Sequence, residues 1–113
     1  MKHPITDKAQ VSIDFPDKFY VGWFGRDSSL DVSADDHGVH INLERQEATK
    51  RRVGFHLHYY LLADLLQTIG EALSRYRVID EPHRAALADA TETLSKAVKS
   101  AGRGASGKPR QRP

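Results

Sequence analysis

Three histidines in one stretch of alternating sequence have the types and spacing that metal chemistry needs. His56 and His58 are two positions apart, so on a β-strand their side chains lie on the same face of the sheet. If 39–45 and 52–59 pair as a hairpin, His40 lies opposite His58, within about 5.5 Å at Cβ. Imidazoles this close suit zinc or another borderline cation. We therefore expect a metal site of His40, His56 and His58.

Other roles for these histidines stay open. The same pairing places Asn42 opposite His56, and Glu44 or Asp36 would add a carboxylate ligand. The alternative is that the histidines are polar residues on a hydrated sheet face, or that His58 caps the start of a helix. A change of register by one residue would also separate the set, because it moves every side chain to the opposite face.

The residue content argues against most enzymatic sites. The chain has no cysteine, which excludes disulfides, thiolate metal sites and cysteine nucleophiles. It lacks the signature of a phosphate-binding P-loop, and its serines lack the glycine-flanked context of a nucleophile elbow. Asp35 and Asp36 sit in a predicted turn, where hydrogen bonding to the backbone is their ordinary role. We expect a binding protein that is not an enzyme, with zinc as its one candidate cofactor.

The elements that must position these residues follow from periodicity. Residues 10–59 alternate between apolar and polar, which is the period of half-buried strands. Turn signals at 16–18, 25–28 and 35–38 and a polar loop at 46–51 divide this stretch into five short strands. We expect an antiparallel meander, in which neighbours in sequence pair in space. Its covered face would carry Val11, Ile13, Val21, Trp23, Val39, Ile41, Leu43, Phe55 and Leu57.

After the strands the period changes from 2 to 3.6. A leucine-rich stripe from Leu61 to Leu73 predicts a helix that ends near Tyr76 and covers the sheet. Asp80 is a good N-cap for a second helix, from about Glu81 to Ala101, with Gly102 as its stop. The fold class is therefore α+β, a five-stranded meander followed by two helices. We expect an N-terminal arm (1–9), one domain (10–101) and a tail (102–113).

The opposite face of the sheet would be mixed in character and is a candidate binding surface. Two aromatic residues and one arginine on this face, Tyr20, Phe24 and Arg52, would allow nucleic-acid bases to stack. Asp31 and Glu44 lie on the same predicted face and argue against a groove that follows phosphates.

Charge is concentrated at the C-terminal end of the chain. The whole chain has a formal net charge of +2, but residues 96–113 contain six Lys and Arg and no acidic residue, so the preceding part is mildly acidic. From Gly102 onward no large apolar residue is present, so we expect this tail to be disordered. Flexible cations attract nucleic-acid phosphates and release counterions. The candidate contacts are Arg103, Lys108, Arg110 and Arg112.

Residues 107–113, Gly-Lys-Pro-Arg-Gln-Arg-Pro, resemble the AT-hook, whose core is Pro-Arg-Gly-Arg-Pro. The resemblance covers seven residues. It implies that Arg110 and Arg112 lie along the minor groove of A·T-rich DNA, that Pro109 and Pro113 hold the backbone extended, and that Lys108 contacts a phosphate. Gln111 stands where the family has glycine, which counts against deep insertion of the backbone into the groove.

Three functions follow from these features. The first is a DNA-associated module, in which the tail contacts nucleic acid and the α+β body forms a homodimer or binds a partner. The second is a protein-interaction or structural module with a passive tail. The third is the histidine metal site. The sequence has no apolar run of the length that a membrane span needs and no secretory signal, so we expect a cytoplasmic protein without a membrane partner.

Overall fold

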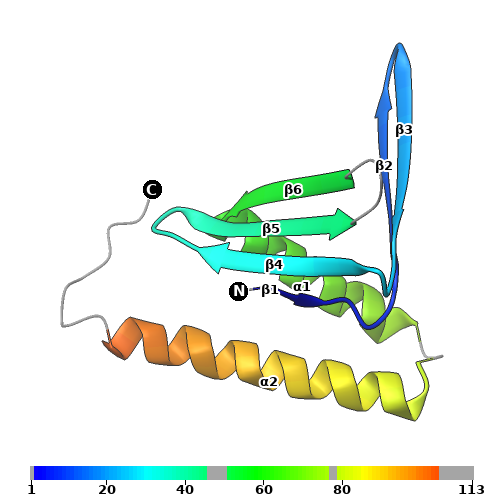
Figure 1. The fold of residues 1–113 in the computed structure, drawn as a ribbon. Coiled ribbons are helices and arrows are strands. Elements are labelled where there is room, and N and C mark those ends of the chain that lie inside the picture. Colours follow the sequence, from blue (N-terminus) through cyan, green and yellow to red (C-terminus); the bar gives the residue numbers. More distant parts are fainter. Residues whose placement is uncertain (1, 46–50, 77–78, 105–113) are drawn as a thin grey trace. The chain divides into compact units, whose positions relative to one another are not determined.

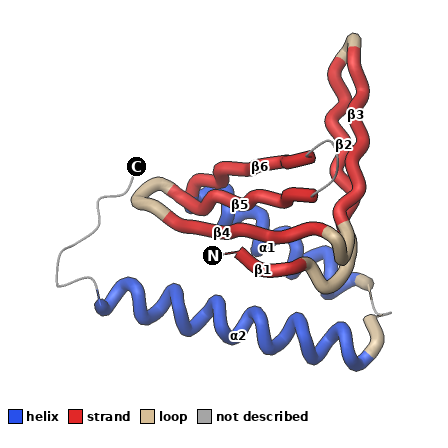
Figure 2. Tube along the Cα trace, in the orientation of Figure 1, coloured by secondary structure: helices blue, strands red, loops and turns tan. Residues whose placement is uncertain are grey.

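The computed structural model describes residues 2–45, 51–76 and 79–104, and their elements are six strands and two helices (Figure 1). The α+β class and the antiparallel pairing are confirmed. Figure 2 separates the strands from the two helices that follow them. The strands are β1 (Lys2–Pro4), β2 (Ala9–Phe15), β3 (Lys18–Phe24), β4 (Ser28–Ala34), β5 (Gly38–Arg45) and β6 (Arg51–His58).

The predicted five-stranded meander was wrong, because the strands form two sheets. One sheet has four strands in the order β1-β4-β5-β6, and the other contains only β2 and β3. β1 comes from the expected N-terminal arm, and its three residues are too few to show a period in the sequence. Three of the neighbour pairings that the meander predicts are present, β2 with β3, β4 with β5 and β5 with β6. The pairing of β3 with β4 is not, because periodicity identifies strands but does not show where a sheet ends.

The four-stranded sheet has one apolar and one polar face, as its alternation predicts. Cross-strand pairing aligns Val32 with Ile41, and Ile41 with Phe55, on the apolar face. The adjacent row, Ser33 with His40 and His40 with His56, belongs to the polar face. The histidines are therefore on the face that the sequence indicated.

Helix α1 (Tyr59–Arg75) begins directly after β6, and the leucine-rich stripe follows one side of it. No residue of α1 is buried, and Leu61 and Leu65 are 54% and 43% exposed. The expectation that the sheet buries this stripe was wrong. A stripe predicts that one side of a helix is buried, but it does not identify what buries it.

Helix α2 (Glu81–Gly104) begins at the predicted N-cap. The Asp80 carboxylate accepts a hydrogen bond from the backbone N–H of His83 at 3.1 Å, as an N-cap side chain does. The helix continues three residues past the predicted end at Ala101, so the segment expected as disordered tail begins with a helical turn. The side chains of 102–104 lie outside the description.

The chain divides into two compact units, Met1–Gly70 and Glu71–Pro113. The first contains all six strands and most of α1, and the second contains the end of α1 and all of α2. Phe24, at 3% exposure, is the hydrophobic side chain that is buried among the described residues. Neither described helix has the length and apolar content that a membrane span requires.

Candidate metal site

The turn between β4 and β5 presents a carboxylate to the polar face of the sheet. Asp35 follows the last residue of β4, and its Oδ1 accepts hydrogen bonds from the backbone N–H groups of His37 (2.8 Å) and Gly38 (2.9 Å). This local pattern is the ordinary reason for aspartate at such a turn. It fixes the carboxyl group and leaves Oδ2 directed toward the neighbouring strands.

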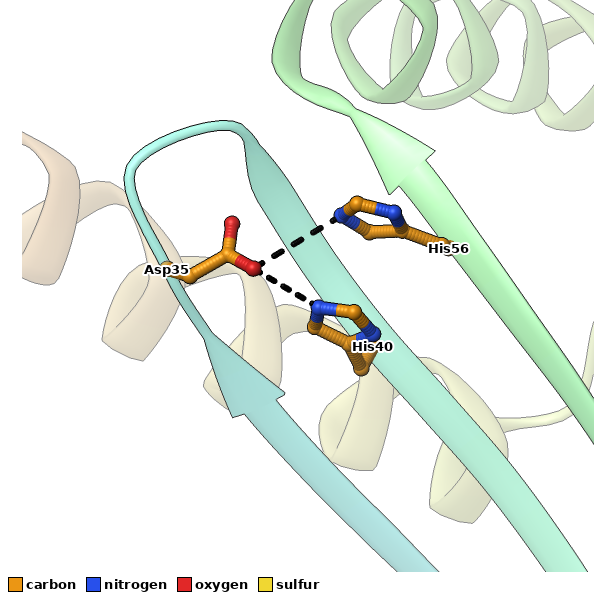
Figure 3. Close-up of side chains that lie close together, drawn as sticks. All are labelled: Asp35, His40 and His56. Atoms are coloured by element: carbon orange, nitrogen blue, oxygen red, sulfur yellow. Dashed lines mark hydrogen bonds and ion pairs between the residues drawn. The ribbon is translucent and has the colours of Figure 1, made fainter.

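Two imidazoles meet that oxygen. His40 on β5 and His56 on β6 are directly opposite in the antiparallel register, so their rings stack with centroids 3.9 Å apart and planes 8° from parallel. Figure 3 shows both rings directed toward Asp35, one from each strand. The Nε2 atoms of His40 and His56 lie 2.8 Å and 3.8 Å from Asp35 Oδ2.

These distances fit the ligand set of one small cation. One ligand atom from each residue lies within 4.8 Å of the other two. Bond lengths of about 2.1 Å in a tetrahedral zinc site place neighbouring ligand atoms about 3.4 Å apart. The shorter and the longer contact differ from that value by about half an ångström each. Because an imidazole nitrogen binds a metal ion in the plane of its ring, the two stacked rings would also have to turn apart to share one ion.

The electrostatics keep the carboxylate charged. The hydrogen bond to His40 holds the pKa of Asp35 well below its usual range, and the backbone N–H groups of His37 and Gly38 act in the same direction. The side chains of Asp35, His40 and His56 are 44%, 40% and 38% exposed. An ion held by them would face solvent, so water would complete its coordination.

Contacts outside the three ligands hold the turn against the end of β6. The hydroxyl of Tyr59 donates to the backbone carbonyl of Asp35 at 2.7 Å, and the Tyr59 N–H donates to the carbonyl of His37 at 3.3 Å. Gly38 lies so close to β6 that a Cβ at this position would be 2.1 Å from the carbonyl oxygen of Leu57. This close approach requires glycine.

The predicted pairing of His40 with His58 was wrong. His40 is opposite His56, and His58 is opposite Gly38, so the true register differs from the expected one by two residues. Because an even shift keeps every side chain on its face, His40 and His56 still meet. The ring of His58 stands edge-on to that of His56, with centroids 4.9 Å apart, and it is not one of the three clustered ligands.

The predicted carboxylate ligands were Glu44 and Asp36, and Asp35 was not among them. Glu44 is paired with Arg52 across the strands, and its carboxylate binds Lys2 at 3.1 Å. The prediction gave Asp35 a role only in the turn, but its Oδ2 atom also lies close to His40 and His56. The signal that could have identified it is its place at the end of β4, from which the turn brings it beside His40.

The predicted base-stacking surface does not form. Tyr20 and Phe24 are on β3 in the two-stranded sheet, whereas Arg52 is on β6. Phe24 is buried, so it presents no ring to a base. Arg52 donates to the Asn42 side chain at 3.3 Å and lines a shallow polar depression of about 210 Å³. The other residues that line the depression are Lys2, Ser29, Asp31, Asn42 and Glu44.

The predicted nucleic-acid contacts lie largely outside the described residues. Arg103 has its backbone in α2, and its side chain is outside the description, as are Lys108, Arg110 and Arg112. The AT-hook resemblance therefore stays a prediction from sequence.

Compared with protein-family models, curated proteins and solved structures, the chain gives no match in any of the three comparisons. The function must be argued from the site itself.

Proposed function

We propose that this chain binds a divalent transition-metal ion of the zinc class through Asp35, His40 and His56. One observation carries the proposal, namely that the three ligand atoms lie within 4.8 Å of one another around a carboxylate that its own turn holds in place. A carboxylate fixed in this way supports the proposal because its orientation is established before an ion arrives.

The ligand types define the class of ion. Two imidazole nitrogens and one carboxylate oxygen suit zinc, nickel or copper, whereas magnesium and calcium prefer an all-oxygen set. The proposal is one of binding and not of catalysis, since these half-exposed side chains do not form the enclosed pocket in which most enzymes hold a substrate.

The test is a titration of the full chain with Zn²⁺, followed by calorimetry and by the NMR signals of the histidine rings. We expect saturable binding of one ion per chain at micromolar metal, with the His40 and His56 signals shifting together. His40→Gln and His56→Gln should each weaken binding by about 10- to 100-fold.

Asp35→Asn tests the role of Asp35 as a ligand without disturbing the turn. Asparagine keeps an oxygen for the backbone N–H groups of His37 and Gly38 but removes the charged ligand. It should fold normally and bind Zn²⁺ weakly. The matched control is His3→Gln, since His3 pairs with Leu30 and so belongs to the opposite face of the same sheet. Equal loss in the control, or unchanged affinity in His40→Gln and His56→Gln, would refute the site.

A second candidate function rests on charge. We propose that residues 96–113, with six cations and no acid, bind nucleic acid, with A·T-rich duplex DNA as the preferred target. Six phosphate contacts predict that log K falls with log salt concentration with a slope of about −5. Deleting 102–113 should abolish binding to an A·T-rich duplex at about 50 mM salt, a concentration at which salt weakens phosphate contacts little. Binding that survives the deletion would exclude the tail.

A further inference from the structure

The hairpin of β2 and β3, residues 9–24, which we name the arm, has large apolar side chains on both of its faces. Its register places Ile13 opposite Tyr20, with Phe15 two residues further along the same face. The other face has Phe19, Val21 and Trp23 of β3. The β2 residues on that face are polar, namely Gln10, Ser12 and Asp14. A strand at the surface normally has one polar face, so the large apolar residues on both faces of β3 are typical of a strand that is covered on both sides.

The structure leaves both faces of the arm exposed. Phe15 and Tyr20 on one face are 53% and 52% exposed, and Phe19 and Trp23 on the other are 64% and 51% exposed. An isolated two-stranded hairpin is marginally stable in water. Aromatic side chains bury about 150–250 Å² each, so covering the exposed half of these four would remove roughly 300–500 Å² from water.

Helix α1 offers a second exposed apolar surface in the same unit of the chain. Four residues of its stripe that belong to this unit share one side of the helix and are 42–54% exposed, namely Leu61, Leu65, Leu66 and Ile69. Asp64 and Gln67 lie on the other side. The stripe has the width of a helix side that packs on another layer.

We infer that a second copy of this chain covers these surfaces, with the arm of each copy packed on the α1 stripe of the other. Two complementary apolar surfaces on one chain satisfy each other reciprocally in a two-fold symmetric dimer. The arm and the stripe occur twice in such a dimer. The two arms remove about 600–1,000 Å² and the two stripes add to it, so the total lies in the range of a standard specific interface, about 1,200–2,000 Å².

The near absence of a core favours a second copy over another occupant. Among the described residues of Met1–Gly70, six strands are accompanied by one buried hydrophobic side chain, that of Phe24, so a cover is needed for folding itself. A second copy is present whenever the chain is made. A lipid bilayer is a poor alternative, because the tip of the arm carries Asp14, Asp17 and Lys18, and charges are costly in hydrocarbon.

The first experiment measures the mass and the unfolding of the full chain. Size-exclusion chromatography with light scattering should give twice 12.7 kDa. The urea midpoint should fall when the protein is diluted 100-fold, because dilution favours separated and unfolded chains. A mass of 12.7 kDa at millimolar protein with a midpoint that does not depend on concentration would overturn the inference. The same monomer bound to a different protein would also overturn it.

A complementation experiment tests the contact between arm and helix. The arm variant carries Phe19→Asp and Trp23→Asp, and the helix variant carries Leu65→Asp and Ile69→Asp. Each alone should lose the dimer, but an equimolar mixture should recover a heterodimer, because one arm and one stripe remain intact in it. Gln67→Glu, which adds charge off the stripe, should keep the wild-type mass.

If neither variant folds alone, recovery of structure on mixing gives the same answer. A mixture that stays monomeric while the wild type is dimeric would contradict the arm-to-helix contact.

Discussion

At the scale of the residue, Asp35 shows how a turn residue becomes part of a site. One oxygen satisfies the backbone N–H groups of His37 and Gly38, and the other faces two imidazoles. Hydrogen bonding in the turn is enough to explain an aspartate at this position, so the turn pattern alone offered no sign of its contact with the two imidazoles. Because Oδ1 is already occupied, the direction of Oδ2 is decided by the backbone and not by the histidines.

Gly38 is the residue whose replacement should damage the site without touching a ligand. In Gly38→Ala the new Cβ would meet backbone atoms of β6, the Leu57 oxygen at 2.1 Å, so the strands must separate. Overpacking of this kind costs about 1–3 kcal/mol of unfolding free energy. Urea denaturation of the variant measures this loss.

Gly54→Ala is the matched control for that prediction. Its nearest neighbour would be the Oδ1 atom of Asn42 at 2.6 Å, the end of a side chain that can rotate away. We expect a smaller loss of stability than for Gly38→Ala. If the two variants lose equal stability, the close backbone approach at Gly38 is not what requires glycine there.

At the scale of the element, periodicity and turn signals predicted most strands, both helices and three of the strand pairs, but not the break between β3 and β4. The five longer strands, β2 to β6, and the stripe from Leu61 to Leu73 were found because each period reflects one face of one element. The partner of a strand depends on contacts distant in sequence, which is why β1 and the separation of the arm were missed. The cluster of Asp35, His40 and His56 was predicted in part. His40 and His56 stay on the same face of the sheet when the register shifts by two residues, as it does here.

The start of α2 should respond to acid through Asp80. Hydrogen bonding to the backbone N–H of His83 is the main cause that lowers the pKa of Asp80, and contact with the His83 ring adds to it. A lowered pKa in the folded state means that the ionised cap stabilises the helix above the ordinary pKa of aspartate, near 3.8. That stabilisation is lost as the pH falls through the lower, folded value. Exchange of the His83 amide should therefore accelerate relative to mid-helix amides below about pH 4.

Two variants check the assignment of that acid response. Asp80→Ala should show fast exchange at His83 at every pH, because the cap is absent. Asp80→Asn keeps an acceptor and should show slow exchange with no acid transition. An acid transition that persists in Asp80→Asn would assign the effect to another group in the first turn, such as Glu81 or His83 itself.

At the scale of the whole molecule, the two proposed activities belong to different units. The proposed metal ligands are in Met1–Gly70, and the cationic stretch 96–113 is in Glu71–Pro113. All of the acidic residues precede residue 96, so the excess positive charge is confined to the second unit. Failure of one proposal therefore leaves the other standing, and variants in one unit serve as controls for the other.

Zinc should accordingly protect one unit and leave the other unchanged. An ion present at 100 times its dissociation constant stabilises the bound form by about 2.7 kcal/mol, because it binds the folded arrangement of ligands and not the open one. Amide exchange in β5 and β6 should then slow by about 100-fold, while exchange in α2 keeps its rate. Asp35→Asn should remove the protection. Equal slowing in β5, β6 and α2 would show that the units open together, and unchanged exchange in β5 and β6 would show that zinc does not bind the folded hairpin.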